Sequence, residues 1–167
     1  MQSRNTEIEI NIQHMRRFAL ALTRDPARAD DLVQDTVERA MSKWRLRDPR
    51  RPLRPWLFAI LHNLHVSAHR RGFRMVMVEA DIDRIGDTGS TPEGRIELNQ
   101  VLGLLAQLPD EQRTAILLVS VEGFSYAEAA KILKVPAGTL MSRLSRGRTK
   151  LRELVETPPA QRLRRVI

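Results

Sequence analysis

The stretch from Gly123 to Arg148, GFSYAEAAKILKVPAGTLMSRLSRGR, constrains the fold more than any other part of the chain. Ser125 stands three residues before Glu128, so the hydroxyl and the carboxylate can cap the first turn of a helix reciprocally. Further on, Pro136 suits the first position of a second helix, where its missing N–H loses no hydrogen bond. The stretch therefore predicts a helix-turn-helix.

The second of these helices has an apolar stripe and a basic face. Leu140, Leu144 and Leu151 recur at spacings of four and seven, which places them on one buried side. The other faces carry hydroxyl groups and cations, the groups that bind phosphates and major-groove base edges. A solvated helix of an ordinary bundle is the weaker interpretation. The candidate DNA-binding residues are Thr139, Ser142, Arg143, Ser145, Arg146 and Arg148.

The composition agrees with a helical protein that binds nucleic acid. A formal charge of +8 and a pI near 11.0 favour a polyanionic partner. No apolar run reaches the roughly 20 residues of a membrane span, and the N-terminus lacks a signal-peptide pattern, so we expect a cytosolic protein. The chain has no cysteine, which excludes disulfides, thiolate metal sites and cysteine nucleophiles. Aromatics at 4% and sparse glycine fit an all-α fold.

The first half of the chain predicts three helices. The first covers residues 6–23, and the second starts where Asp25 and Pro26 supply an N-cap and a first-turn proline. The third covers residues 55–71. Apolar residues at helical spacing give each helix a core-facing stripe. In the second helix we expect Trp44 to be the last residue of this stripe and to face the core.

The second helix also carries an acidic face. Its polar residues at spacings of zero, three, four and seven are Asp31, Gln34, Asp35 and Glu38, with Asp30 beside them. Three interpretations fit: a metal or general-acid site, a docking surface for a basic partner, or solvated residues near a helix N-terminus. Catalysis is the weakest, because no nucleophile or phosphate-binding loop accompanies the acids. The spacing leaves the other two open.

A basic, proline-broken loop over residues 46–54 leads into the third helix, which has a polar face of its own. Amide and guanidinium groups there can hydrogen-bond base edges and phosphates, although an ordinary helix surface fits the pattern equally well. The candidate DNA-binding residues of this half are Arg51, Arg54, Asn63, Arg70 and Arg71.

Three histidines of the third helix raise the question of a metal site. His62, His65 and His69 can share one side of the helix, but no cysteine or nearby acid completes a zinc ligand set. We therefore predict no metal and no cofactor.

The helical pattern breaks down over residues 72–91, which favours a flexible linker. Beyond it, Pro92 starts a helix with leucines on one face, and Asp110 starts a further helix that leads into the helix-turn-helix. The predicted organisation is a domain over 1–72, a linker over 73–91, a domain over 92–156 and a basic tail of unassigned role over 157–167.

Two segments resemble a known family. ADDLVQDTVERAMSKW (29–44) followed by RPWLFAILHNL (54–64) resembles the sigma-two domain of the extracytoplasmic-function group of bacterial sigma factors. LPDEQRTAILLVSVEGFSYAEAAKILKVPAGTLMSRLSRGRTKLREL (108–154) resembles their sigma-four domain. In this order the two segments identify the chain as a member of that family. The resemblance implies a sigma-two-like helical bundle and a sigma-four-like helix-turn-helix domain.

The resemblance also implies partners. In the family the acidic helix binds the β′ clamp helices of core RNA polymerase, and Asp31, Gln34 and Asp35 fall in the matching motif. Docking then outweighs the other interpretations of this face. The 46–54 loop and Asn63 match the parts that recognise and hold open the minus-ten promoter element, and the last helix reads the minus-thirty-five element. A β-flap contact, an anti-sigma factor, a monomeric free state and the absence of enzymatic activity are implied as well.

Two residues depart from the family pattern. Ser67 stands where many members carry an acid, and with GFSYAEAA it is similar to the general-stress-response subgroup of alphaproteobacteria, whose members a small anti-sigma protein holds inactive. Met141 stands where many members carry Lys or Arg, so no minus-thirty-five preference is implied.

Two alternatives remain. A sigma mimic would sequester an anti-sigma factor without binding promoters, but known mimics carry a receiver domain, for which this chain has no room. A stand-alone helix-turn-helix repressor explains residues 108–154 and leaves the acidic helix and Asn63 unexplained.

Overall fold

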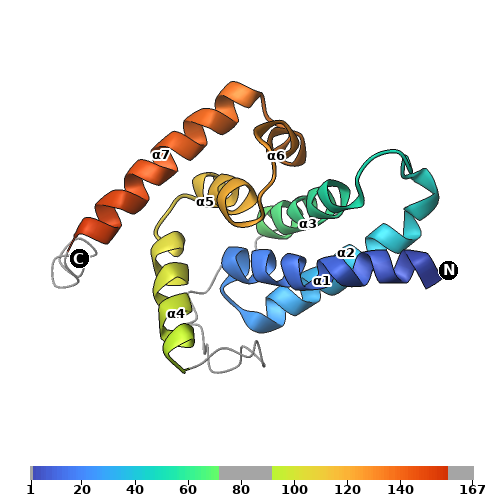
Figure 1. Ribbon diagram of the computed structural model, residues 1–167, viewed down its shortest axis with the longest axis horizontal. Coiled ribbons are helices and arrows are strands. Elements are labelled where there is room, and N and C mark those ends of the chain that lie inside the picture. The colour runs from blue at the N-terminus through green and yellow to red at the C-terminus, as the bar shows by residue number, and fades with distance from the viewer. Residues whose placement is uncertain (1, 72–91, 158–167) are drawn as a thin grey trace.

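The computed structural model describes residues 2–71 and 92–157, and in these ranges every regular element is a helix (Figure 1). The predicted linker over 73–91 and all but the first residue of the predicted tail lie outside the described residues. The elements are α1 (Gln2–Thr23), α2 (Pro26–Ser42), η1 (Trp44–Leu46), α3 (Leu53–Arg70), α4 (Pro92–Ala106), α5 (Asp110–Ile116), the π-helical turn η3 (Leu117–Val121), α6 (Tyr126–Leu133) and α7 (Ala137–Glu156). The all-α prediction is confirmed.

The first domain is the bundle of α1, α2 and α3. Its core contains the fully buried side chains of Phe18, Leu57 and Leu61. As predicted, the Asp25 carboxylate caps α2 by accepting the N–H groups of the first turn. Trp44 departs from its expected core position, because α2 ends at Ser42 and the indole falls in η1, where it is half-buried.

The second domain consists of α4 to α7 and contains the predicted helix-turn-helix. Ser125 Oγ accepts the N–H of Glu128 at 3.1 Å, and Glu128 Oε2 accepts the N–H of Ser125 at 3.0 Å, which confirms the capping box. Pro136 is the residue before α7 rather than its first residue. Leu140 and Leu144 lie in the core as the stripe predicted.

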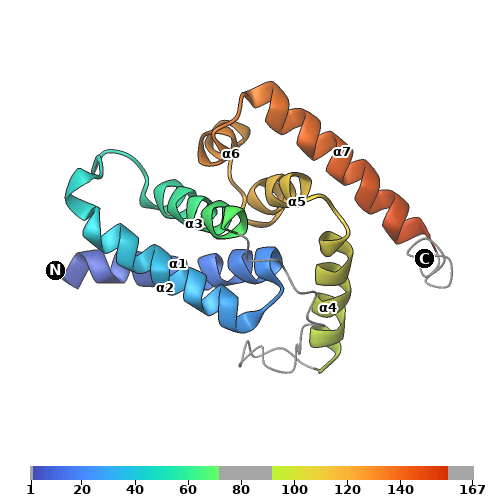
Figure 2. The ribbon, with the colours of Figure 1, turned by 180° about the vertical axis from the view of Figure 1, so that it is seen from behind.

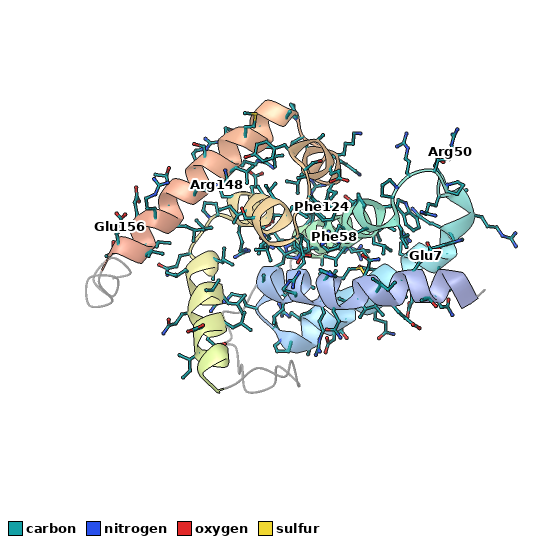
Figure 3. The ribbon with its side chains drawn as sticks, viewed as in Figure 1. Glu7, Arg50, Phe58, Phe124, Arg148 and Glu156 are labelled. Carbon is teal, nitrogen blue, oxygen red and sulfur yellow. The ribbon has the colours of Figure 1, made fainter. Side chains whose placement is uncertain are left out.

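The two domains pack against each other. Helix α3 lies beside α6 in both ribbon views, and α1 contacts α4 and α5 (Figures 1 and 2). At the centre of this contact Phe58 of α3 meets Phe124, just before α6, with ring centroids 5.0 Å apart at an interplanar angle of 69° (Figure 3). Buried apolar residues of both domains therefore form one continuous core.

Candidate nucleic-acid and protein interfaces

The acidic face of α2 is assembled as the sequence predicted. All five predicted polymerase-binding residues are exposed, while Leu32, Val33 and Thr36 turn into the core. Asp30 accepts two hydrogen bonds from the Arg16 guanidinium, at 2.7 and 3.2 Å. The exposed residues are Asp30, Asp31, Gln34, Asp35 and Glu38. Most of this face is therefore available to a basic partner.

The acidic face continues into a hollow between α2 and α3. Asp31 and Asp35 line this hollow of about 390 Å³ together with basic side chains, among them His69 and Arg71. The carboxylates and the basic end of α3 are thus neighbours on one surface.

The 46–54 loop presents arginines to solvent. Asp48 accepts hydrogen bonds from the backbone N–H and the guanidinium of Arg50, and these lower the pKa of Asp48 below its ordinary value. The Arg47 guanidinium donates to the Arg51 carbonyl at 2.9 Å. With the loop ordered in this way, the side chain of Arg51 is 82% exposed.

Arg54 differs from the other predicted DNA-binding residues of the first domain. Its side chain is 31% exposed, and its guanidinium donates to Glu122 Oε2 at 2.7 Å. Asn63, Arg70 and Arg71 are exposed on or just after α3. The structure therefore keeps those three at the surface and draws Arg54 into the contact between the domains.

On α7 a short hydrogen-bond chain orders one arginine of the predicted DNA-binding face. Ser142 Oγ donates to the Thr139 carbonyl at 2.9 Å and accepts from Arg146 Nη2 at 3.3 Å. The guanidinium is thereby tethered to the helix surface, close to the N-terminal turns that enter the major groove in helix-turn-helix proteins.

The remaining predicted residues of α7 fall in two environments. Ser145 and Arg148 are exposed, and Arg148 Nη1 donates to the Tyr126 hydroxyl at 3.4 Å. Arg143 is only 17% exposed, and it pairs with Glu111 of α5 at 3.1 Å. Met141, which was not among the predicted contacts, is 55% exposed on the same helix.

The histidines of α3 lie in different environments. His65 is buried, with Nε2 at 3.6 Å from Asp110 Oδ1 of α5, whereas His69 is exposed. Burial, assisted by the charge of His65, lowers the pKa of His62 to about 4. Burial alone would raise the pKa of Asp110, but the nearby charge of His65, with the charge and hydrogen bond of Arg113, holds it well below its usual range. Among the described residues no three His, Asp or Glu side chains lie close enough to hold a metal ion.

The most buried charged group at the domain contact is one that sequence reasoning missed. The side chain of Glu122 is fully buried and is held by Arg17 and Arg54. Arg17 is 105 positions and Arg54 is 68 positions from Glu122 in the sequence, and no local sequence pattern predicts these contacts. The only sequence signal is a carboxylate placed between an apolar run and a glycine.

Comparisons with known proteins match both domains. The family model "Sigma-70, region 4" matches residues 98–151, and "Sigma2 domain of PhyR" matches residues 8–62. The chain is 38% identical over 152 residues to the ECF RNA polymerase sigma factor EcfG of Rhodopseudomonas palustris, covering 90% of this chain and 83% of the relative. It is 30% identical over 141 residues to SigM of Bacillus subtilis, covering 83% and 86%.

Solved structures give the same match. The sigma factor RpoE of Bartonella quintana, in complex with the anti-sigma factor NepR, has a TM-score of 0.79 at 32% identity, over 94% of this chain and 99% of RpoE. CnrH, in complex with the cytosolic domain of CnrY, has a TM-score of 0.69 at 28% identity, over 92% and 89%. The anti-anti-sigma factor PhyR shares the fold at 18% identity and a TM-score of 0.62, over 50% of its chain.

Two helical domains, the second of which contains a helix-turn-helix, define a two-domain, all-helical DNA-binding protein. With the similarities above, the chain belongs to the extracytoplasmic-function family of RNA polymerase sigma factors. The named relatives are sigma factors rather than enzymes. None of the described helices is long and apolar enough to cross a membrane.

Proposed function

We propose that this protein is an alternative sigma factor that binds core RNA polymerase and directs promoter recognition and DNA opening. One observation carries the proposal: an exposed acidic helix and an exposed basic helix-turn-helix lie on one chain that matches sigma factors over nine-tenths of its length. We assign no catalytic step to the chain.

Docking on the polymerase is assigned to the acidic face of α2. Asp31, Gln34 and Asp35 would meet the β′ clamp helices, and the second domain would meet the β flap. Exposed carboxylates on a protein of net charge +8 give a local field opposite to that of the rest of the surface. Such complementarity fixes orientation and speeds association.

Promoter recognition is divided between the domains. The arginine-rich 46–54 loop and the exposed Asn63 would bind the minus-ten element, and α7 would read the minus-thirty-five element in the major groove. Binding of single-stranded bases by the first domain favours the open duplex, because selective affinity for one state shifts the equilibrium toward it.

An anti-sigma protein is the proposed regulator. RpoE of Bartonella quintana was solved with the anti-sigma factor NepR, and CnrH with the cytosolic domain of CnrY. The likeness to EcfG and to RpoE supports a place in the alphaproteobacterial general-stress-response subgroup. The protein would act as a monomer in the bacterial cytoplasm until it binds polymerase.

Run-off transcription tests the proposal. Purified bacterial core polymerase is incubated with a randomised promoter library, with and without this protein. Transcripts that require the protein and share two spaced upstream elements are the expected result. If the protein neither binds polymerase nor yields transcripts, the sigma mimic or the stand-alone repressor becomes the favoured function.

A sigma mimic is the second candidate, favoured by the match of residues 8–62 to the sigma-two domain of PhyR. A mimic would bind the anti-sigma factor with high affinity but support no polymerase-dependent transcription. The same assay, with an anti-sigma pull-down beside it, separates the two functions.

A further inference from the structure

The side-chain carboxylate of Glu122, in the second domain, is bound by side chains of the first domain. Its Oε1 accepts from Arg17 Nε at 3.0 Å, and its Oε2 accepts from Arg17 Nη2 at 3.2 Å and from Arg54 Nη2 at 2.7 Å. His14 Nδ1 lies 3.1 Å from Oε2. Three polar side chains from α1 and α3 thus surround one carboxylate.

The backbone around Glu122 fixes it at this position. The π-helical turn η3 ends here, with the Glu122 N–H donating to the Leu117 carbonyl at 2.9 Å. Gly123 then adopts φ of 72°, which glycine reaches without strain, and the chain turns so that Phe124 packs on Phe58. The carboxylate and the aromatic ring therefore reach the first domain together.

The contact stabilises the packed arrangement because a buried carboxylate needs its partners. When the domains part, Glu122 loses both arginines and regains water, so these hydrogen bonds exist only in the closed form. The Arg54 guanidinium also lies over the rings of Phe124 and Phe58, at 4.6 and 5.4 Å. Charge-assisted hydrogen bonds and ring contacts thus act on the same side chain.

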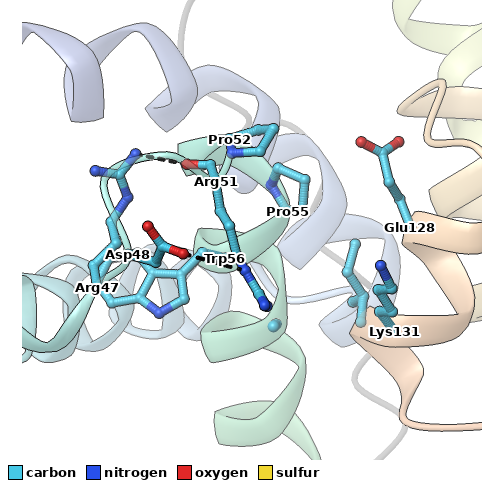
Figure 4. A pocket seen from close by; sticks show the side chains of 10 residues that line it. Arg47, Asp48, Arg51, Pro52, Pro55, Trp56, Glu128 and Lys131 are labelled. Atoms are coloured by element: carbon cyan, nitrogen blue, oxygen red, sulfur yellow. Dashed lines mark hydrogen bonds and ion pairs between the residues drawn. The ribbon is translucent and has the colours of Figure 1, made fainter.

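Closure competes with DNA for the first domain. Arg54 is one of the predicted minus-ten contacts, and in the closed form its charge is neutralised by Glu122. Beside it, α6 carries Glu128 and Lys131 to the far wall of a hollow of about 500 Å³ that the 46–54 loop and Trp56 line (Figure 4). The second domain therefore stands next to the loop that would bind the promoter strand.

The closed form is too small to use both DNA-binding surfaces at once. Elements 25 base pairs apart are separated by about 85 Å along B-DNA, at about 3.4 Å per base pair. A compact chain of this length has a radius of gyration of about 15 Å. The domains must separate when the protein occupies both promoter elements.

We propose that Glu122 is an interdomain latch that holds the free protein closed by occupying Arg54 and Arg17, and that promoter engagement requires its release. This inference rests on the proposed sigma function. The Glu122 carboxylate takes the place on Arg54 that a DNA phosphate would take. Opening on the promoter exchanges one anion for the other.

The variant Glu122→Gln tests the latch with little change in side-chain volume. Small-angle X-ray scattering of the free protein should show a larger radius of gyration for this variant than for wild type, with unchanged helicity by circular dichroism. Glu153→Gln is the control, because it removes the same charge from a residue that, among the described residues, forms its ion pair within α7, with Lys150. Equal radii for all three proteins would overturn the proposal.

A functional measurement follows on promoters recovered by run-off transcription. If the closed form predominates, removing the latch should lower the protein concentration for half-maximal transcription roughly tenfold, since apparent affinity scales with the open fraction. An unchanged concentration would contradict the latch. A third outcome separates the two proposals. If neither protein yields transcripts but Glu122→Gln has the larger radius of gyration, the sigma function is contradicted and the latch is supported.

A second variant tests whether an increased radius could come from local unfolding of the second domain. Arg17→Gln removes the bidentate partner from the first domain and leaves every residue of the second domain unchanged. It should also increase the radius of gyration. If Glu122→Gln lost helicity and Arg17→Gln stayed as compact as wild type, Glu122 would be a residue of the domain's own fold and the proposal would fail.

Discussion

At the residue scale, Gly147 decides how closely α7 approaches α5. A methyl group at this position would lie 2.7 Å from Ile116 Cδ1 and 3.3 Å from Gln112 Cβ. We expect Gly147→Ala to lower the free energy of unfolding by about 1–3 kcal/mol, because overpacking outweighs the gain in helix propensity. Urea denaturation measures the change.

Gly138 provides the matched control for this experiment. It lies in the same helix with nothing within 4 Å of an added methyl group. Gly138→Ala should raise the free energy of unfolding by about 0.5–1 kcal/mol. Equal effects of the two substitutions would contradict the close crossing of α5 and α7.

The tethered Arg146 is expected to read a base. Arg146→Ala should weaken binding to a minus-thirty-five duplex by about 1–3 kcal/mol and relax preference at one position. Binding to duplexes that differ at single positions measures this, with Arg152→Ala, an exposed residue farther along α7, as the control. A uniform loss across sequences would assign Arg146 to a phosphate.

Asn63 is the residue best placed to test base capture by the first domain, because it is exposed on α3. Asn63→Ala should impair open-complex formation on a duplex promoter more than on a pre-melted one. The reason is that its contact would stabilise only the separated strand. Permanganate footprinting of both templates measures the difference, and equal losses would argue against base capture.

At the element scale, the prediction concerns α2 as a docking helix. Replacing Asp31 and Asp35 by Lys should abolish binding to core polymerase. Both carboxylates are exposed, and the lysines would bring positive charge against a basic partner surface. Helicity should be retained. The same double reversal at Glu7 and Glu9, exposed on α1, changes net charge equally and should leave binding intact.

Elements with local signals could be predicted from the sequence. The Asp25 cap and the Ser125–Glu128 capping box each depend on residues within three positions, and both are present. The π-helical turn η3 could not be predicted. The apolar run TAILLVSV is compatible with an uninterrupted α-helix, and no residue in it indicates where the π-helical hydrogen bonds begin.

At the scale of the whole molecule, the sequence predicted two domains but not their contact. A sequence pattern describes one helix at a time, whereas Arg54 and Glu122 are 68 positions apart. Arg54, in the first turn of α3, follows the basic residues of the preceding loop, and nothing local in the sequence distinguishes it from the exposed Arg51. The exposed faces of α2 and α7 could be predicted, because periodicity alone separates surface from core.

The folded protein should lose stability in acid. The charges facing His62 come from His65 on its own helix and from Asp110, Lys134 and Arg143 in the second domain. Since the pKa of His62 is lowered from 6.5 to about 4, the unfolded chain takes up this proton first as pH falls. The free energy of unfolding should therefore decrease between those values, by at most about 1.4 kcal/mol per pH unit.

Substitution of His62 isolates this effect. His62→Gln cannot titrate and should flatten the decrease between pH 6.5 and 4, whereas His69→Gln, at an exposed position, should leave it unchanged. Asp110 also has a lowered pKa, so it contributes to the loss of stability only below pH 3.8, the ordinary pKa of an aspartate. Denaturation curves across the range would contradict the assignment if His62→Gln kept the wild-type slope.

A tryptophan that lines the hollow in Figure 4 provides an intrinsic fluorescence signal for the position of α6. The chain has two tryptophans, Trp44 and Trp56, both in the first domain and packed edge to face with ring centroids 6.2 Å apart. Trp56 lines the hollow, and α6 forms the opposite wall. Departure of α6 would bring water to the indole and move its emission to longer wavelengths, so intrinsic fluorescence can follow domain separation in real time without any attached dye.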